Sequence, residues 1–296
     1  MNKLDEIRSL YHDENILVLT NDQITLSTIK VDINNHKITL DGIDKLKVFY
    51  LLNQDTIINY QFKSDIEFSE IFYDINNDVV LTQNYEIDNN INVHIVNCTE
   101  NNSKLTRKVN TILKEGSYTK IDNLFISSDS INVDCMYDIV ESNTSLNINN
   151  AIINDSGKQQ NYNFNVKHNK ASSQSEMITY AISKNSSILN VNTDGVIVQK
   201  AVKTTLNQKT KGIILDDESQ ISANPILEID EYDVIASHGA SIGAIDDEEL
   251  YYLMSRGLTK EVAERMIING LIYPFLNSIN DSTLSEYIRH IIDKHL

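Results

Sequence analysis

The sequence predicts a mainly β fold, in which a parallel β-helix is followed by a small helical domain. Apolar and polar residues alternate in many short segments, and helical periodicity is nearly confined to residues 244–296. The connections are rich in Asn and Ser, while the 296 residues include only nine Gly and two Pro. Tight hairpin turns therefore cannot be the rule, and short strands joined by Asn-rich corners favour a coiled stack. An irregular sandwich or a large barrel remains compatible with this pattern.

Residues 1–15 are predicted to form a short amphipathic helix. Leu4, Ile7 and Leu10 recur at helical spacing and form one apolar face. A helix of this length is not stable alone. Because the open ends of a β-helix require cover, we expect this helix and the C-terminal helices to cap the two ends.

Residues 16–243 are predicted to form the β-helix core. Ile29–Ile33 and Tyr162–Val166 alternate apolar with polar side chains, the period of strands with one buried face. The Asn-Asn, Asn-Asp and Ser-Asp pairs between such segments tolerate turns and left-handed backbone geometry. No fixed repeat period is visible. Further strand-like segments are Ile24–Ser27, Val79–Leu81, Ile91–Val96, Leu124–Ile126, Ser145–Asn149 and Gly195–Val198.

Residues 244–296 are predicted to form three helices. Asp246 and Glu249 have the spacing of a capping box, which begins the first helix, and Gly257 after Arg256 ends it. The second helix is predicted to begin at Thr259 and to end at Gly270, before Pro274. Thr283 and Glu286 are predicted to cap the N-terminus of the third helix. These residues form the predicted C-terminal helical domain.

Composition excludes several functional classes. The net charge of −17 is too negative for a surface that follows nucleic-acid phosphates, so we expect no nucleic-acid partner. No run of eighteen apolar residues occurs, and the first residues are polar, so neither a membrane span nor a signal peptide is expected. The predicted location is cytoplasmic. No Gly-x-x-x-x-Gly-Lys-(Ser/Thr) loop is present, so ATP binding of the P-loop kind is not expected.

The two cysteines do not form a metal site by themselves. Cys98 and Cys135 lack Cys-x-x-Cys spacing and paired His residues, which excludes a self-contained zinc or four-cysteine cluster site. Each is interpreted first as a buried free thiol. In a β-helix, however, residues one rung apart line a common channel, and Cys135 is the better candidate there to carry sulfur or bind iron.

The segment Ala236–Leu258 resembles a known family. Ser237-His-Gly-Ala-Ser241 leads into Asp247-Glu-Glu-Leu-Tyr-Tyr-Leu-Met-Ser-Arg-Gly257, an order similar to the C-terminal signature of the SufB/SufD family of iron–sulfur cluster scaffolds. Leu215–Ile229 resembles the run that precedes this signature. The specific match covers Leu215 to Gly270. The resemblance implies a right-handed parallel β-helix, which decides between the fold alternatives.

Within the family, this chain is more similar to SufD than to SufB. SufB proteins have His-Glu-Ala where this chain has His238-Gly239-Ala240, and a cysteine upstream where this chain has none after Cys135. The resemblance implies that His238 is an iron ligand for a transient iron–sulfur cluster, with Glu228 as a carboxylate ligand or partner. The alternatives are a hydrogen-bonded His238 that fixes the local turn and a Glu228 that faces solvent.

The resemblance also implies partners. In this family a SufC-like ABC ATPase docks on the C-terminal helical domain, and a second SufB/SufD-type subunit pairs with the β-helix to give a homodimer or heterodimer. The expected chain is thus a scaffold and not an enzyme. The residues expected to contact the ATPase are Leu250, Tyr251, Met254, Arg256, Met266 and Ile267. The alternative for most of them is packing against the end of the solenoid.

An enzyme remains the alternative function. Gly239-Ala-Ser241-Ile-Gly243 fits the Gly-x-Ser-x-Gly elbow of α/β-hydrolases, with Ser241 as the nucleophile. The strands and helices that should alternate before such an elbow are missing, which argues against this interpretation. A carbohydrate-active β-helix enzyme with paired carboxylates is the other form of this alternative.

Overall fold

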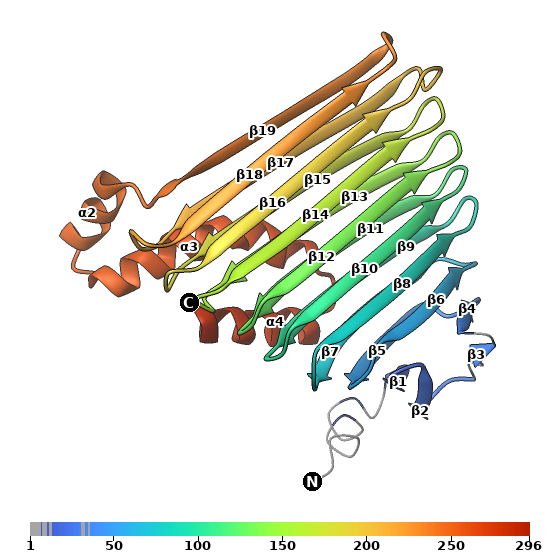
Figure 1. The fold of residues 1–296 in the computed structure, drawn as a ribbon, viewed down its shortest axis with the longest axis horizontal. Coiled ribbons are helices and arrows are strands. Elements are labelled where there is room, and N and C mark those ends of the chain that lie inside the picture. Colours follow the sequence, from blue (N-terminus) through green and yellow to red (C-terminus); the bar gives the residue numbers. More distant parts are fainter. Residues whose placement is uncertain (1–6, 8–10, 12–13, 31–32, 35) are drawn as a thin grey trace.

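The computed structural model is a parallel β-solenoid of about eight turns, followed by helices (Figure 1). It describes residues 7, 11, 14–30, 33–34 and 36–296. The helix predicted within residues 1–15 falls largely outside this part of the chain and stays a prediction. The predicted parallel β-helix is confirmed.

The strands form two sheets that together make the wall of the solenoid. From β4 onward, even and odd strands alternate between the sheets, so the chain crosses from one sheet to the other after each strand. The ten-stranded sheet contains β1 (Ile16–Thr20), β2 (Gln23–Ser27), β5 (Lys45–Leu52), β7 (Ile66–Ile75), β9 (Asn92–Asn101), β11 (Tyr118–Ser127), β13 (Ser145–Asn154), β15 (Gln174–Ser183), β17 (Thr204–Ile214) and β19 (Val234–Ala244). The nine-stranded sheet contains β3 (Ile33–Asn34), β4 (Lys37–Leu40), β6 (Thr56–Phe62), β8 (Val79–Ile87), β10 (Leu105–Leu113), β12 (Ile131–Ile139), β14 (Gln159–His168), β16 (Ile188–Ile197) and β18 (Gln220–Ile229).

Strands of successive rungs pair in parallel and in register over most of their length. Along β12, for example, Ile131 lies opposite Leu105 of β10, and the pairing continues without a shift to Ile139. Alternate side chains point inward, and both sheets contribute to one continuous apolar core. The first strands depart from this pattern, because β2 and β3 pair in antiparallel hairpins with β1 and β4. The register of β5 with β7 also shifts between Tyr50 and Leu51.

Asparagine side chains form ladders along the strands, and not only at the corners. On the outer face of the nine-stranded sheet, Asn84 donates to Asn59 at 2.7 Å and Asn110 donates to Asn84 at 2.8 Å. A second ladder joins Asn161 to Asn132 at 2.8 Å, and Asn190 to Asn161 at 2.9 Å. Each amide thus satisfies its neighbour one rung away, which makes the Asn content part of the rung-to-rung pairing.

The C-terminal residues form α2 (Asp247–Ser255), α3 (Lys260–Ser278) and α4 (Ser282–His295). Asp246 caps α2 as predicted, since its carboxylate accepts from the backbone N–H groups of residues 248 and 249. Two predicted boundaries are wrong. α3 continues through Gly270 and Pro274, and α4 is capped by Asp281 two residues before the predicted start. Burial of apolar residues on both sides of Pro274 offsets the backbone hydrogen bond that proline removes.

α3 and α4 lie along the outer face of the ten-stranded sheet, instead of capping the solenoid end (Figure 1). A second apolar cluster forms between them and that face. It contains Val96, Cys98, Leu124, Ile126, Ala151, Ile153 and Ile182 of the sheet and Ile268, Ile272, Phe275, Leu284, Ile288 and Ile292 of the helices. The last rung, β18 and β19, consequently remains open, and both strands are largely exposed. Within the described residues, no helix is both long enough and apolar enough to cross a bilayer.

Candidate functional site

His238 lies in the middle of β19, on the last rung of the solenoid. It shares the inward side of this strand with Ala236, which packs against the core around Leu206. It lies directly opposite Gln208 of β17. Because no further rung in the described part of the chain covers β19, the side chain of His238 is exposed at the open end. This geometry leaves the imidazole free to bind a ligand from outside the chain.

Gln208 forms a buried floor beneath His238. Its side chain is only 4% exposed. In the amide orientation that satisfies both ends, its nitrogen donates to the carbonyl of Thr193 at 3.2 Å and its oxygen accepts from the N–H of Gly195 at 3.0 Å. Gly195 is needed here, since a Cβ atom would lie 2.7 Å from Leu206 and 2.9 Å from Gln208. The last covered rung is therefore tightly filled.

A charged cluster is buried deeper inside the solenoid. Glu70 and Arg107 are 0% and 1% exposed, and Arg107 Nη2 lies 3.2 Å from Glu70 Oε2. The carboxylate also accepts from Tyr50, Tyr85 and Gln83. Burial raises the pKa of the Glu70 carboxyl, and the nearby Arg107 opposes this rise.

A row of buried polar side chains runs from this cluster toward the last rung. We call it the polar file, and it consists of Asn97, Asn123, Asn150 and Thr179 on β9, β11, β13 and β15. Asn97 donates to Asn123 at 2.7 Å, Asn123 to Asn150 at 2.8 Å, and Asn150 to Thr179 at 3.1 Å. All four are at most 2% exposed. The sequence analysis did not identify this row. Many Asn residues lie on the strands, and which of them face inward follows only from the strand register seen in the structure.

Cys135 points into the core beside the polar file. Burial raises the pKa of its thiol to about 11, and it hydrogen-bonds Tyr137. It lies on β12, three strands before β18 in its sheet, which is roughly 14 Å at the usual strand spacing. Cys98 lies on the other side of the wall, in the apolar cluster beneath α4. The structure thus brings neither cysteine next to His238.

Glu228 and Ser241 also lie apart from His238. Glu228 is exposed on β18 of the opposite sheet, on the side facing away from the core. The Glu228 carboxylate acts on Asp194, whose pKa is raised first by burial and then by the negative charge of Glu228. Ser241 sits in the middle of β19, where extended strand replaces the strand-to-helix turn of a hydrolase elbow.

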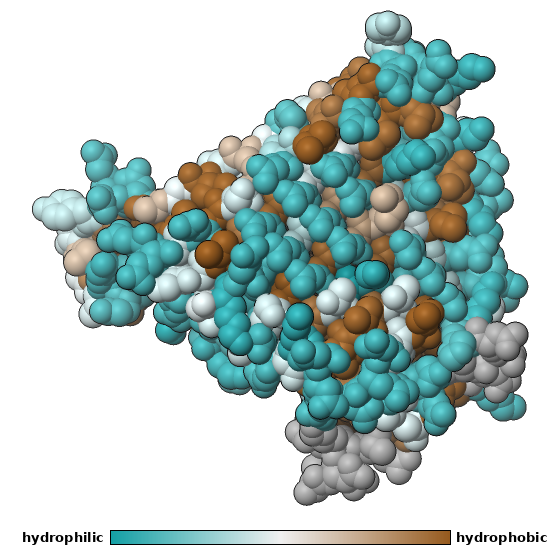
Figure 2. Space-filling view, in the orientation of Figure 1, coloured by the Kyte–Doolittle hydropathy of each residue, from teal (hydrophilic) through white to brown (hydrophobic). Residues whose placement is uncertain are grey.

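The side chains expected to contact the ATPase form an apolar surface on α2 and the first half of α3. Tyr251, Met254 and Met266 are 75%, 41% and 52% exposed, and Arg256 is exposed and stacks on Tyr252. Leu250 and Ile267 are half-buried. No residue of α2 is buried within this chain. Figure 2 shows apolar surface beside α2 and near the last rung. Tyr252 and Val262 are also exposed apolar residues of these two helices, and the sequence analysis did not single them out.

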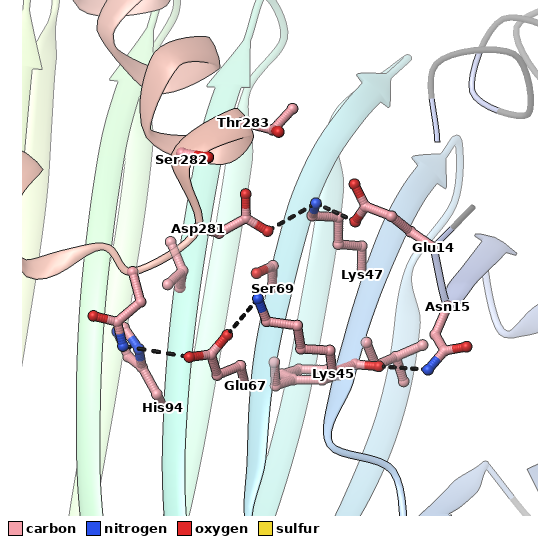
Figure 3. A pocket seen from close by; sticks show the side chains of 14 residues that line it. Glu14, Asn15, Lys45, Lys47, Glu67, Ser69, His94, Asp281, Ser282 and Thr283 are labelled. Atoms are coloured by element: carbon pink, nitrogen blue, oxygen red, sulfur yellow. Dashed lines mark hydrogen bonds and ion pairs between the residues drawn. The ribbon is translucent and has the colours of Figure 1, made fainter. Parts of the chain in front are cut away.

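A charged cleft of about 440 Å³ separates the start of α4 from the ten-stranded sheet. Figure 3 shows Lys47 between Glu14 and Asp281, and Lys47 Nζ lies 2.9 Å from Asp281 Oδ2. Lys45 pairs with Glu67 at 2.9 Å, and Asn280 donates to the same carboxylate. Since each of these two lysines already has a carboxylate partner, we interpret the cleft as the joint that fixes α4 to the sheet.

The described residues do not supply a complete metal site. No group of three or more His, Cys, Asp and Glu side chains in this part of the chain converges on one point. His238 therefore offers a single imidazole, and further ligands for iron would have to come from another molecule or from inorganic sulfide.

Comparisons with known proteins identify the family. Residues 51–271 match the family model described as "SUF system FeS cluster assembly, SufBD core domain". The iron-sulfur cluster assembly protein SufD of Bacillus subtilis is 34% identical over 135 residues, which is 46% of this chain and 31% of that protein. SufD of Escherichia coli is 32% identical over 100 residues, or 34% of this chain and 24% of that protein.

A third relative is similar over a stretch of comparable length. The iron-sulfur cluster assembly SufBD family protein of Pyrococcus horikoshii is 41% identical over 103 residues, or 34% of this chain and 22% of that protein. The matched stretches thus span less than a third of each of these three relatives. The family model nevertheless covers most of the solenoid and the helices up to the middle of α3. The chain belongs to the SufB/SufD family of the SUF system for iron–sulfur cluster assembly.

Proposed function

We propose that this chain is a cytoplasmic, non-catalytic scaffold subunit on which iron–sulfur clusters are assembled or transferred, together with a SufC-like ABC ATPase. The observation that carries the proposal is the position of His238, exposed at the uncovered last rung of a rigid solenoid. The cluster is the cargo, and its remaining ligands would come from a facing subunit.

The uncovered rung supports a second SufB/SufD-type subunit as partner. Ile229, Tyr232 and Ile235 are 40%, 101% and 69% exposed there, next to two strand edges that no strand of the described residues pairs with. An exposed strand edge beside apolar side chains is a typical surface for pairing with another chain. A facing subunit would cover both features and bring its own ligands close to His238.

The ATPase would bind the apolar surface of α2 and the first half of α3. α2 contributes only exposed and half-buried residues, so contacts among the described residues cover its apolar side chains only in part. α4 and the second half of α3 are fixed to the sheet by buried apolar contacts. A movement imposed on α2 would therefore be transmitted to the solenoid wall and not absorbed by a loose domain.

Iron reconstitution tests the role of His238. His238→Ala should reduce the iron and acid-labile sulfide bound after anaerobic reconstitution of the complex with its partner subunit. His290→Ala is the matched control, since His290 is exposed on α4 far along the chain from β19. Equal cluster content in both variants would reject His238 as a ligand.

Co-purification tests the ATPase contact. Met266→Glu and Tyr251→Glu should each abolish capture of the ABC ATPase by the tagged chain, because each places a charge in the centre of the apolar surface. Ile57→Glu is the control, since Ile57 is 54% exposed on β6 near the other end of the solenoid. Capture that persists in both α2–α3 variants would reject this docking surface.

A further inference from the structure

The cleft beside the start of α4 is not filled by the side chains that join this helix to the sheet. About 440 Å³ remains open between them, a volume within the range of small-molecule sites. Residues of β5, β7 and β9 line one side, and residues 14–15 and 280–283 line the others (Figure 3). The joint therefore leaves a space that a small ligand can enter.

Ser69 has an unused hydroxyl in this cleft. It lies on β7, directly opposite Lys47 of β5, and Figure 3 shows it between Asp281 and Lys45. Ser69 is only 7% exposed, and among the described residues its hydroxyl has no hydrogen-bond partner. Buried hydroxyls normally have a partner. Because Ser69 lines the cleft, a ligand there can supply the missing one.

The N-terminus of α4 supplies further donors to the cleft. The backbone N–H groups of Ser282 and Thr283 belong to the first turn of the helix, where N–H groups lack partners inside the helix. Both residues line the cleft, and the positive end of the helix dipole favours negative charge there. Lys45 Nζ lies 2.9 Å from Glu67 Oε2, and an ammonium has three N–H bonds to donate. A carboxylate in the cleft can therefore accept several hydrogen bonds.

The charges in the cleft do not favour a simple anion. The cleft is lined by two lysines and three carboxylates, which are Lys45, Lys47, Glu14, Glu67 and Asp281. The imidazole that also lines it, His94, is engaged at 2.6 Å by Asp122, which does not line the cleft. An anion would lie close to three negative charges, which oppose its binding. A ligand that also carries a positive group would be stabilised by both signs of charge.

Glu14 is the carboxylate with an oxygen to spare. Both oxygens of Glu67 and both oxygens of Asp281 already have partners in the chain. Glu14 contacts Lys47 through Oε2 alone, and its side chain is 37% exposed. Within the described residues, Glu14 Oε1 is therefore the acceptor left in the cleft for a cationic group.

We propose that this cleft binds a small zwitterion with the adjacent ammonium and carboxylate groups of an α-amino acid. The ligand carboxylate accepts from Ser69, from Lys45 and from the N-terminus of α4. The ligand ammonium donates to Glu14. The cleft lies near the opposite end of the ten-stranded sheet from β19, so this binding goes beyond cluster assembly and does not depend on it.

Titration of the full chain with glycine, the smallest such zwitterion, tests the proposal. Binding is followed through the backbone amide NMR shifts of Ser69, Ser282 and Thr283. Acetate and methylammonium each present one half of the ligand. Each should bind at least about tenfold more weakly than glycine, because each loses one set of charged hydrogen bonds.

Three variants remove one contact each. Ser69→Ala should weaken glycine binding about tenfold, because it removes a hydrogen bond to a charged group. Glu14→Gln should weaken glycine binding about two- to fivefold without weakening acetate binding, since it removes only the partner of the ammonium. Ser282→Pro should weaken both ligands about two- to fivefold, because it removes one N–H group of α4.

The variants are compatible with the fold. Proline is favoured at the first position of a helix, and Asp281 before it is already extended, with ψ 109°. Ser222→Ala is the matched control for Ser69→Ala, since Ser222 is exposed on β18 of the other sheet. This control should bind glycine like the unmodified chain.

The proposal is overturned if glycine shifts none of the three amides, or if acetate binds as tightly as glycine. Equal glycine binding by Ser69→Ala and Ser222→Ala would also overturn it. None of these measurements involves iron, the ATPase or a second subunit. Absent glycine binding with intact cluster loading would therefore count against this cleft alone, and the reverse result would count against the proposed function alone.

Discussion

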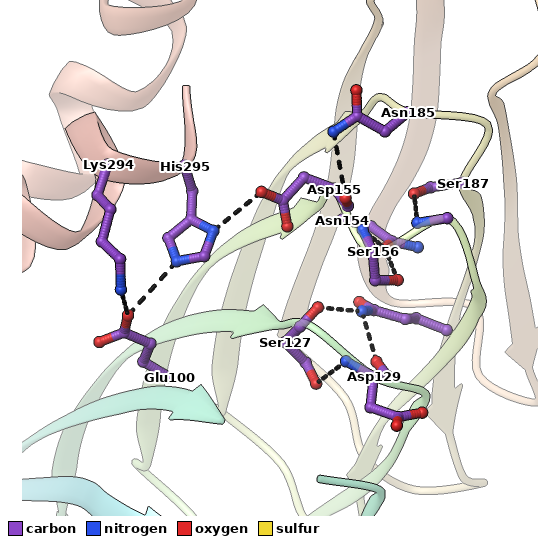
Figure 4. Close-up of polar contacts among 12 residues, drawn as sticks. Glu100, Ser127, Asp129, Asn154, Asp155, Ser156, Asn185, Ser187, Lys294 and His295 are labelled. Atoms are coloured by element: carbon purple, nitrogen blue, oxygen red, sulfur yellow. Dashed lines mark hydrogen bonds and ion pairs between the residues drawn. The ribbon is translucent and has the colours of Figure 1, made fainter. Parts of the chain in front are cut away.

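His295 Nδ1 lies 2.9 Å from Asp155 Oδ2, which joins the last turn of α4 to the corner after β13 (Figure 4). Glu100 of β9 completes this contact, since its Oε1 atom lies 3.4 Å from His295 Nε2 and 2.7 Å from Lys294 Nζ. The other end of α4 is held by Asp281 and Lys47. The helix is therefore fixed to the ten-stranded sheet at both ends by charged pairs and in between by apolar contacts.

The contact at His295 predicts a pH-dependent stability. Hydrogen bonds to Asp155 and Glu100 raise the pKa of His295 from 6.5 to about 9. The contribution of His295 to the free energy of unfolding is therefore complete below pH 6.5 and is lost as the pH rises to 9. Hydrogen bonding to His295 and Lys294 lowers the pKa of Glu100 from 4.5 to about 2, so that contribution is complete above pH 4.5 and is lost as the pH falls to 2. Both contributions are complete between pH 4.5 and 6.5.

We expect the free energy of unfolding to fall by about 1 to 2 kcal/mol between pH 6 and pH 9.5 because of this contact, after allowance for its partial exposure. Denaturant unfolding at both pH values measures the difference. His295→Gln should remove most of it, while His290→Gln should leave it unchanged. An equal pH dependence in both variants would contradict the assigned role of His295.

The cysteines should be inert in the folded chain. Burial raises the pKa of Cys135 to about 11 and raises that of Cys98 further, so neither is a thiolate at neutral pH. An aromatic disulfide reagent should titrate no thiols in native protein and both after unfolding. Ser222→Cys, an exposed position on β18, provides the reactive control. Rapid native labelling of Cys135 would show that the core opens and would revive its role as a sulfur carrier.

The strands were predictable from alternation of period two, but the rung length was not. Asn84 and Asn110 are 26 residues apart, Asn132 and Asn161 are 29 apart, and the corresponding pair on β16 and β18 is 32 apart. The additional residues of the longer rungs lie in the corners, and the strands stay in register. The sequence therefore has no constant repeat period.

The sequence contains an indication that the helices cover one face of the sheet, but the alternation of apolar and polar residues does not reveal it. The apolar runs Leu124–Ile126 and Ala151–Ile153 have consecutive buried residues, because one face meets the core and the other meets α3 and α4. His238 was singled out through the family resemblance, and its exposure at an open rung required the structure. Arg107 and Glu70 could not be assigned from the sequence, since charged residues on a strand normally face solvent.

The buried pair of Glu70 and Arg107 predicts a strongly non-additive pair of mutations. Arg107→Met should lower the free energy of unfolding by about 3 to 5 kcal/mol, because it leaves the Glu70 carboxylate buried without its cation. Adding Glu70→Leu to Arg107→Met should recover a large part of this loss. A double-mutant cycle by urea unfolding measures the coupling, and additive losses would show that the two side chains do not stabilise one another.

Gly195 provides the sharpest test of packing beneath the last rung. A Cβ atom there would lie 2.7 and 2.8 Å from the methyl groups of Leu206 and 2.9 Å from Gln208. Gly195→Ala should therefore lower the free energy of unfolding by about 1 to 3 kcal/mol. Gly239→Ala is the control, because a Cβ atom at Gly239 meets nothing within 4 Å. If both alanine variants unfold at the same urea concentration as the parent, the floor beneath His238 is loosely packed. Gln208 then could not hold the inward side of the last rung in a fixed position.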